Sequence, residues 1–177
     1  MSQGFINSQS IALPLSVANG GTGVTSSDPV IQRVSTQTGA VATGTTAIPK
    51  DDTIPQNTEG DQYMSLAITP KNSANILKIE IVANVSASGA GEVITGALFQ
   101  DSTANALAAQ GIQAATATGI YPIVFTHTMT AGTTSSTTFN FRAGNTTGAT
   151  TTFNGASGGR FYGGVNASSI TITEYAT

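Results

Sequence analysis

Apolar and polar residues alternate one by one along short stretches of this chain, and glycine-rich turn sequences separate the stretches. The clearest one is ILKIEIVANV at residues 76–85, where apolar side chains take one set of alternate positions and Lys78, Glu80 and Asn84 belong to the other. A period of two places the apolar side chains on one face of a β-strand. The pattern therefore predicts half-buried strands and not helices.

Similar stretches recur at short, even intervals, which is typical of an all-β sandwich or barrel. The best helical candidate, the Ala-rich residues 103–110, is too short to be stable alone. We expect an antiparallel β-sandwich, and we favour a jelly roll over an immunoglobulin-like sandwich because the chain has no Trp and no Cys. The other expected strands are residues 30–34, 63–69, 93–99, 120–129, 137–143, 150–153 and 169–175.

Charged residues make up only 8% of the chain, against about 25% in an ordinary soluble domain. The six basic residues are scattered, so the sequence argues against binding of nucleic acid or of an anionic membrane surface. The absence of cysteine excludes disulfides and thiolate metal sites. No apolar run reaches the roughly 20 residues of a membrane helix, and the N-terminus lacks the pattern of a secretory signal. We expect no membrane insertion and no export signal.

Residues 1–27 are predicted to be an extended N-terminal attachment arm, and residues 28–177 a head domain. Within the arm Leu13, Leu15 and Val17 alternate with polar or small residues, as in an extended segment that pairs with another chain. The sequence NGGTG at residues 19–23 is typical of a flexible hinge. In the head, Val82 and Val124 lie on the polar faces of their predicted strands. Apolar residues on both faces suggest that one face is buried between subunits of a symmetric oligomer.

Four carboxylates gather in the segment KDDTIPQNTEGD: Asp51, Asp52, Glu59 and Asp61. Paired carboxylates are the groups that hydrolyse glycosidic bonds, and carboxylate oxygens are ligands for Ca²⁺. The segment lacks the residue order of an EF-hand loop. We favour a solvated acidic loop without a metal, and keep calcium binding and glycan hydrolysis as alternatives.

His127 is the single histidine, so a Ser-His-Asp triad would have to use it. It alternates with Phe125 and Met129 on an apolar face, which favours a histidine in the core or between subunits. Three copies meeting on a trimer axis could instead bind an ion. We expect no catalytic residue, no cofactor and no enzymatic activity.

Arg160, Phe161, Tyr162 and Tyr121 fall in or beside predicted loops. Exposed aromatic and arginine side chains are frequent in contact surfaces, so these four are candidates for contacts with a receptor. The alternative is that they pack on a trimer axis or cap the sandwich.

Residues 13–23, LPLSVANGGTG, resemble a motif common in phage tail-fibre proteins, where it lies at or near the join between shaft and head. Residues 34–59, 68–70, 96–107 and 163–174 are similar to the heads of those proteins. The resemblance implies a homotrimeric β-sandwich head on a virion, of the TNF/C1q-like type, and it implies no catalytic residues. Only about a dozen residues precede the motif, so we expect a short fibre or a tip subunit without a long shaft.

The expected function is that of a virion structural protein, a short tail-fibre or fibre-head subunit that contributes to host attachment. Its expected partners are two further copies of itself, another virion protein bound through the arm, and a glycan or protein of the host cell surface. Two alternatives stay open: a capsid-decoration or neck/head-fibre protein without receptor binding, and a small glycan hydrolase that uses Asp51, Asp52 or Glu59.

Overall fold

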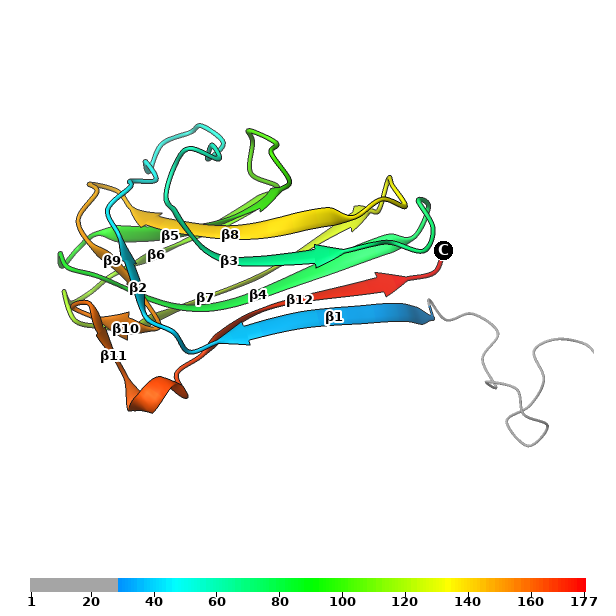
Figure 1. Ribbon diagram of the computed structural model, residues 1–177. Coiled ribbons are helices and arrows are strands. Elements are labelled where there is room, and N and C mark those ends of the chain that lie inside the picture. Colours follow the sequence, from blue (N-terminus) through cyan, green and yellow to red (C-terminus); the bar gives the residue numbers. More distant parts are fainter. Residues whose placement is uncertain (1–28) are drawn as a thin grey trace, which may run out of the picture.

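The computed structural model describes residues 29–177, which form two β-sheets packed face to face (Figure 1). In the first sheet β12 and β7 pair with opposite edges of β4, β1 pairs with β12, and two short strands extend the sheet at one end. All of these pairings are antiparallel. The strands are β1 (Val30–Thr38), β12 (Ser168–Tyr175), β4 (Ile76–Ala87), β7 (Tyr121–Thr130), β9 (Thr151–Phe153) and β2 (Ala42–Gly44).

The second sheet has four antiparallel strands in the order β3-β8-β5-β6. A two-stranded hairpin and one turn of 3-10 helix lie outside both sheets. The bounds are β3 (Asp61–Ile68), β8 (Thr137–Asn145), β5 (Val93–Gln100), β6 (Ala108–Gln113), β10 (Gly155–Ala156), β11 (Gly159–Arg160) and η3 (Tyr162–Gly164).

The strand order is that of a jelly roll. Among residues 29–177, eight strands are six residues or longer, and numbered along the chain they form one sheet in the order 1-8-3-6 and a second in the order 2-7-4-5. This is the double-sheet arrangement of two Greek keys. The all-β jelly-roll sandwich expected from the sequence is thus confirmed.

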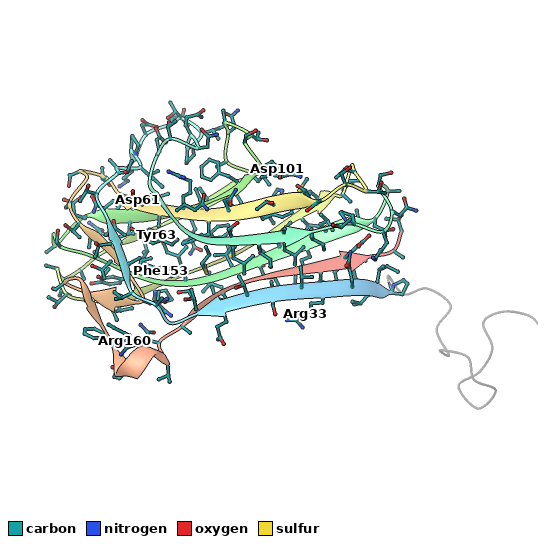
Figure 2. The ribbon with its side chains drawn as sticks, viewed as in Figure 1. Arg33, Asp61, Tyr63, Asp101, Phe153 and Arg160 are labelled. Atoms are coloured by element: carbon teal, nitrogen blue, oxygen red, sulfur yellow. The ribbon has the colours of Figure 1, made fainter. Side chains whose placement is uncertain are left out.

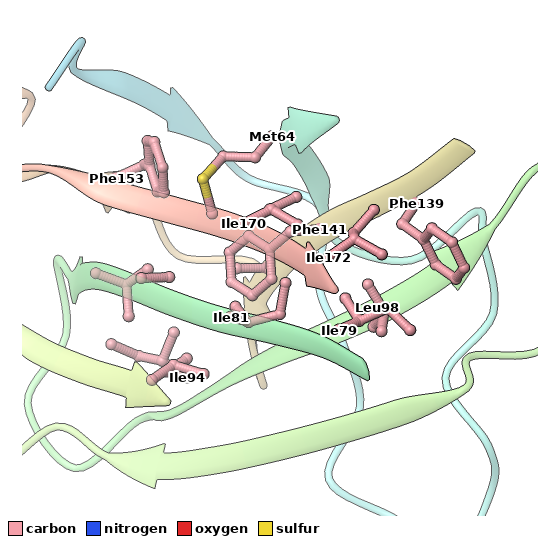
Figure 3. Packing of buried hydrophobic residues seen from close by; sticks show 14 of the residues in the cluster. Met64, Ile79, Ile81, Ile94, Leu98, Phe139, Phe141, Phe153, Ile170 and Ile172 are labelled. Atoms are coloured by element: carbon pink, nitrogen blue, oxygen red, sulfur yellow. The ribbon is translucent and has the colours of Figure 1, made fainter. Parts of the chain in front are cut away.

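The core lies between the two sheets, and the alternation in the sequence locates it correctly. Figure 3 shows isoleucines of β4 and β12 close to Phe139 and Phe141 of β8. The alternating apolar residues Leu77, Ile79, Ile81, Ala83 and Val85 are all 0% exposed, as the period of two predicts. Burying one such side chain stabilises the fold by about 1.5–3 kcal/mol. The central residues are Leu77, Ile79, Ile81, Ala83, Val85, Ile94, Leu98, Ile123, Phe139, Phe141, Ile170 and Ile172.

A second, smaller cluster lies on the outer face of the second sheet. Residues 45–60, between β2 and β3, fold over that face, and Ile48 packs there with Ala97 and Phe99 of β5. All three are at most 1% exposed. The Arg142 side chain fixes the loop by donating hydrogen bonds to the Glu59 and Gly60 carbonyls, at 2.9 and 2.6 Å. We call residues 45–60 the covering loop.

Residues 103–110, the best helical candidate in the sequence, form no helix, as their short length leads one to expect. The chain turns after β5 and enters β6 at Ala108, which pairs with Leu98 of β5. Pairing with the neighbouring strand outweighs the modest intrinsic preference of alanine for helix. Within residues 29–177 no helix has the length and apolar character needed to cross a membrane.

The two ends of the sandwich carry different parts of the chain. At one end β1 begins beside the C-terminus, since Val30 opposes Tyr175 and the Ala176 amide donates to the Pro29 carbonyl at 3.0 Å. At the other end lie β9, the β10–β11 hairpin and η3 (Figure 1). We call these the entry end and the loop end.

A buried carboxylate ties strands together at the entry end. Glu174 of β12 is 0% exposed and accepts hydrogen bonds from the Asn75 and Gln32 side chains at 2.6 and 2.5 Å. The Lys71 and Asn72 amides donate to the same carboxylate at 2.8 and 3.3 Å. Burial alone would raise the pKa of Glu174, but these hydrogen bonds outweigh it and hold the pKa below its ordinary value.

Candidate contact surface

Two buried polar residues clamp the loop that carries most of the candidate contact residues. Asn154 and Ser168 are both 0% exposed, and the Ser168 hydroxyl donates to the Asn154 side-chain oxygen at 2.6 Å. The Asn154 amide group donates to the Thr38 and Ala40 carbonyls at 2.8 and 3.1 Å. Ser168 accepts from the Asn84 amide at 2.9 Å. Residues 155–167 therefore leave the sandwich and return to it at one fixed point, which we call the clamp.

Backbone geometry folds this loop back on the sandwich. The hairpin turn has positive φ at Ser157 (51°) and Gly158 (74°), as a two-residue β-hairpin turn favours. The loop then passes so close to Gly39 that a Cβ atom there would lie 1.7 Å from the Gly164 carbonyl oxygen. Only glycine permits this approach at residue 39.

Three large apolar or aromatic side chains are exposed on the clamped loop. Phe161 is 37%, Tyr162 79% and Val165 82% exposed, and the Phe161 and Tyr162 ring centroids lie 6.0 Å apart at an angle of 57°. Arg160 is also exposed and runs beside Gly164 (Figure 2). Tyr162 has a positive φ of 49°, which is rare for a bulky residue. We call Arg160, Phe161, Tyr162 and Val165 the tip patch.

The side chains of the tip patch are of the types that bind a partner molecule. Two aromatic rings and a valine provide apolar area, and a guanidinium provides a planar set of hydrogen-bond donors for carboxylate or phosphate. Three of its four residues are sequence-based candidates. Val165 was missed, although a lone large apolar residue in a glycine-rich run directly after two aromatics was a usable signal.

Tyr121 is at the loop end but on another part of it. It opens β7, at the edge of the first sheet opposite β1. Its hydroxyl accepts a hydrogen bond from the Thr116 amide at 2.8 Å, within the loop between β6 and β7. Hydrogen bonds from the Thr116 side chain and backbone lower the pKa of Tyr121. The tyrosine thus orders its own loop.

Three of the four carboxylates of the acidic segment lie on the covering loop, and the fourth, Asp61, is the first residue of β3. Three of the four, Asp51, Glu59 and Asp61, accept hydrogen bonds from nearby residues. Asp51 accepts from the Thr53 amide and hydroxyl at 2.8 and 2.5 Å. Glu59 accepts from the Gln56 amide at 2.9 Å. Asp61 accepts from the Thr46 amide and hydroxyl at 2.9 and 3.0 Å, and Asp52 is exposed. Within residues 29–177 no three acidic, histidine or cysteine side chains converge in a group that could hold a metal ion.

His127 lies mid-strand in β7 on the same side as Phe125 and Met129, as the alternation predicts. All three are half-buried, and His127 opposes Ile79 of β4. Burial lowers the pKa of His127, which favours the neutral imidazole. The side chain therefore faces its own sandwich core. The arm residues Leu13, Leu15 and Val17 lie outside the residues that the structure describes.

No family model matches the chain, and no curated protein matches it. Among solved structures it is similar to dimeric latent PorU from Porphyromonas gingivalis (9% identity, 86% of this chain and 14% of that chain, TM-score 0.41). It is also similar to a chain of the infectious bursal disease virus Gt strain (14% identity, 85% and 40% coverage, TM-score 0.40) and to the VP2 subviral particle of that virus (10% identity, 84% and 39% coverage, TM-score 0.36). The chain spans less than half of each of these chains, and matches this distant assign it no family, partner or activity.

Proposed function

We propose that this chain is a non-enzymatic structural protein of a bacteriophage particle, a short tail-fibre or fibre-head subunit that trimerises and contributes to host attachment. The observation that carries the proposal is the separation of the two ends of the jelly roll. The chain enters beside Tyr175, whereas the tip patch lies at the loop end. An arm bound to the particle would thus leave the tip patch pointing away from it.

The chemistry of the tip patch supports a role in recognition. Large exposed apolar side chains on a rigidly anchored loop are characteristic of binding surfaces, because the scaffold limits the entropy that is lost on contact. Tyr and Arg are frequent among residues that dominate binding energy. The resemblance of residues 13–23 and of the head segments to tail-fibre proteins supports the same role.

One apolar spot on the first sheet supports self-association. Val82 and Val124 oppose each other across β4 and β7 on the outer face, and are 41% and 54% exposed. Their cross-strand neighbours on β7 and β12 are mostly serine and threonine, and the charged residues of β4 on this face, Lys78 and Glu80, pair with each other. Such a face can pack against another copy of the chain, and a closed trimer would bury it in every subunit.

Oligomerisation is tested by light scattering on the full-length chain. A mass near three times 17.8 kDa, about 53 kDa, is expected. The double variant Val82→Lys/Val124→Lys should fall to 17.8 kDa with unchanged circular dichroism, while Ser65→Lys, exposed on the other sheet, should stay trimeric. A wild-type mass of 17.8 kDa would reject the trimer.

Attachment is tested by binding of the fluorescently labelled full-length protein to cells of the host bacterium. Phe161→Ser/Tyr162→Ser should reduce binding at least about tenfold, as expected when anchor residues are lost. The matched control is Val30→Ser/Ile31→Ser, which removes exposed apolar side chains (58% and 43%) at the entry end. No cell binding by the wild type, with incorporation into particles retained, would favour a capsid-decoration or neck protein.

A further inference from the structure

A groove runs along the outer face of the second sheet beside β6. Three depressions, of about 410, 480 and 340 Å³, lie in a row there. Asp51, Thr53 and Ala109 line both the first and the second, and Lys50 and Gln113 line both the second and the third. Because neighbouring depressions share their walls, they form one continuous groove. Each has the size of a small-molecule site.

The covering loop produces the groove because it stops short of the edge of the sheet. It buries Ala97 and Phe99 of β5 under Ile48, but leaves the outward residues of β6 exposed. The loop therefore forms one wall, and β5 and β6 form the floor. Small residues keep this floor flat: Gly111 opposes Thr95, and Ala109 opposes Ala97.

The groups that face the groove are mainly side chains and not free backbone. The main-chain groups of β5 and β6 pair with each other in the plane of the sheet. The other edge of β6 is turned toward β7, where the Gln110 side chain accepts a hydrogen bond from the Val124 amide at 3.2 Å. β6 is the edge strand of this sheet, so a peptide strand would add at that edge, beside β7, and not on the outer face that carries the groove.

The charge and polarity of the residues that line the groove limit the chemical class of ligand that it can bind. Asp51, Asp52 and Glu92 contribute carboxylates and Lys50 a single ammonium group, so the groove repels polyanions. Thr95 and Gln113 add a hydroxyl and an amide to the floor. Hydroxyl, amide and carboxylate groups pair with the hydroxyls of a sugar, and the small apolar surfaces of Val93 and Ala109 fit the apolar face of a sugar ring.

We propose that this groove binds a neutral oligosaccharide in an extended conformation along β6. The groove does not include the tip patch. It is therefore a second binding site, and its existence does not depend on the proposed role of Arg160, Phe161 and Tyr162.

The test uses the full-length wild-type protein and isothermal titration calorimetry with maltohexaose, cellohexaose, mannohexaose and chitohexaose. We expect at least one to bind saturably at millimolar concentration and to protect residues 49–55 and 108–113 from hydrogen exchange. Hyaluronan hexasaccharide, which is anionic, should not bind.

Ala109→Trp fills the groove from an exposed position and should weaken binding at least about tenfold. Ala67→Trp is the matched control, because Ala67 is also exposed on the outer face of this sheet, on β3 at its opposite edge. Gln113→Ala and Thr95→Val each remove one polar group and should weaken binding about three- to tenfold without a bulky insertion. Failure of all four neutral hexasaccharides to bind, protection elsewhere, or equal binding by Ala109→Trp and the wild type would overturn the proposal. Cell binding through the tip patch is unaffected by any of these outcomes.

Discussion

Glu174 allows a sharp test of how the entry end is held together. In Glu174→Gln the side-chain oxygen can still accept from Asn75 and from the Lys71 and Asn72 amides, because these three donors meet the same carboxylate oxygen, Oε1. The new amide nitrogen replaces Oε2, which accepts from Gln32 in the wild type. Two donors would then face each other.

Gln32 cannot relieve this conflict by rotating its amide. Its nitrogen also donates to the Thr69 carbonyl at 2.8 Å, so a flip would place two oxygens together there. The variant thus loses one hydrogen bond to a charged group and weakens three others. Since such bonds contribute about 1.5–3 kcal/mol each, we expect the free energy of unfolding to fall by about 3 kcal/mol.

The assay is urea unfolding at neutral pH and one fixed protein concentration, followed by far-ultraviolet circular dichroism. Glu80→Gln is the control, because Glu80 forms an exposed ion pair with Lys78 whose loss should leave stability unchanged within error. A loss below about 1 kcal/mol for Glu174→Gln, within the range of an ordinary surface change, would refute the reasoning.

The same variant should change the dependence of stability on pH. The folded-state pKa of Glu174 lies below the unfolded value of about 4.3. Its contribution is therefore complete above that value and is lost as pH falls through the folded-state pKa. Glutamine does not titrate, so the difference in stability between wild type and variant should shrink between pH 5 and pH 3. A constant difference over that range would contradict a pKa lowered by folding.

Three further predictions concern other parts of the sandwich. Phe99→Ala should destabilise the fold by about 3–4 kcal/mol in urea unfolding, because it empties the cluster under the covering loop. Ile54→Ala, at a 55% exposed position of the same loop, should have little effect. Equal effects of the two variants would contradict the burial of Phe99. Arg142→Lys cannot reproduce both hydrogen bonds to the Glu59 and Gly60 carbonyls, so hydrogen exchange in residues 45–60 should accelerate while that of β4 stays unchanged. Tyr63 stacks on Phe153 with ring centroids 5.0 Å apart, and burial raises the pKa of the Tyr63 hydroxyl. The neutral Tyr63 side chain therefore stabilises the fold below the ordinary tyrosine pKa of about 10, and this stabilisation declines as pH rises above that value. In an alkaline absorbance titration Tyr63→Phe should thus remove a late, unfolding-coupled step, and loss of an early step instead would show that Tyr63 is accessible.

The sandwich could be predicted from the sequence wherever large apolar residues alternate with polar ones. Phe139 and Phe141 of β8 face inward as expected, and both are 0% exposed. β6 could not be recognised, because AAQGIQ contains one large apolar side chain, Ile112, and a single residue has no period. Its conformation depends on pairing with β5, which local propensity does not encode.

The covering loop shows a second limit. Ile48 and Ile54 each lie next to a proline in a polar segment and are equivalent in the sequence. In the structure Ile48 is 0% exposed and Ile54 is 55% exposed. The difference arises from Phe99, which is far away in the sequence and offers a partner to only one of them. The groove beside β6 results from the same packing and was equally unpredictable.

The candidate contact residues were predicted in part. A glycine-rich run next to Arg160 indicates an exposed loop, and exposure of Phe161 and Tyr162 follows from it. That Tyr121 lies on another edge depends on the order of the strands, which the sequence does not reveal. The clamp could not be predicted either, because nothing in the sequence distinguishes Asn154 and Ser168 from other polar residues. Only the fold brings their side chains within 2.6 Å of each other.

The clamp has a consequence for how this surface can diversify. Because Asn154 and Ser168 hold both ends of residues 155–167 at one point, the exposed residues 160–163 and 165 can vary without moving a core strand. Gly155 and Ala156 cannot, because Ala156 is buried and a side chain at Gly155 would collide with the Gly159 carbonyl oxygen. A library randomised at the exposed positions 160–163 and 165 should therefore retain the jelly roll in most members, and offers a route to new binding specificities on an unchanged scaffold.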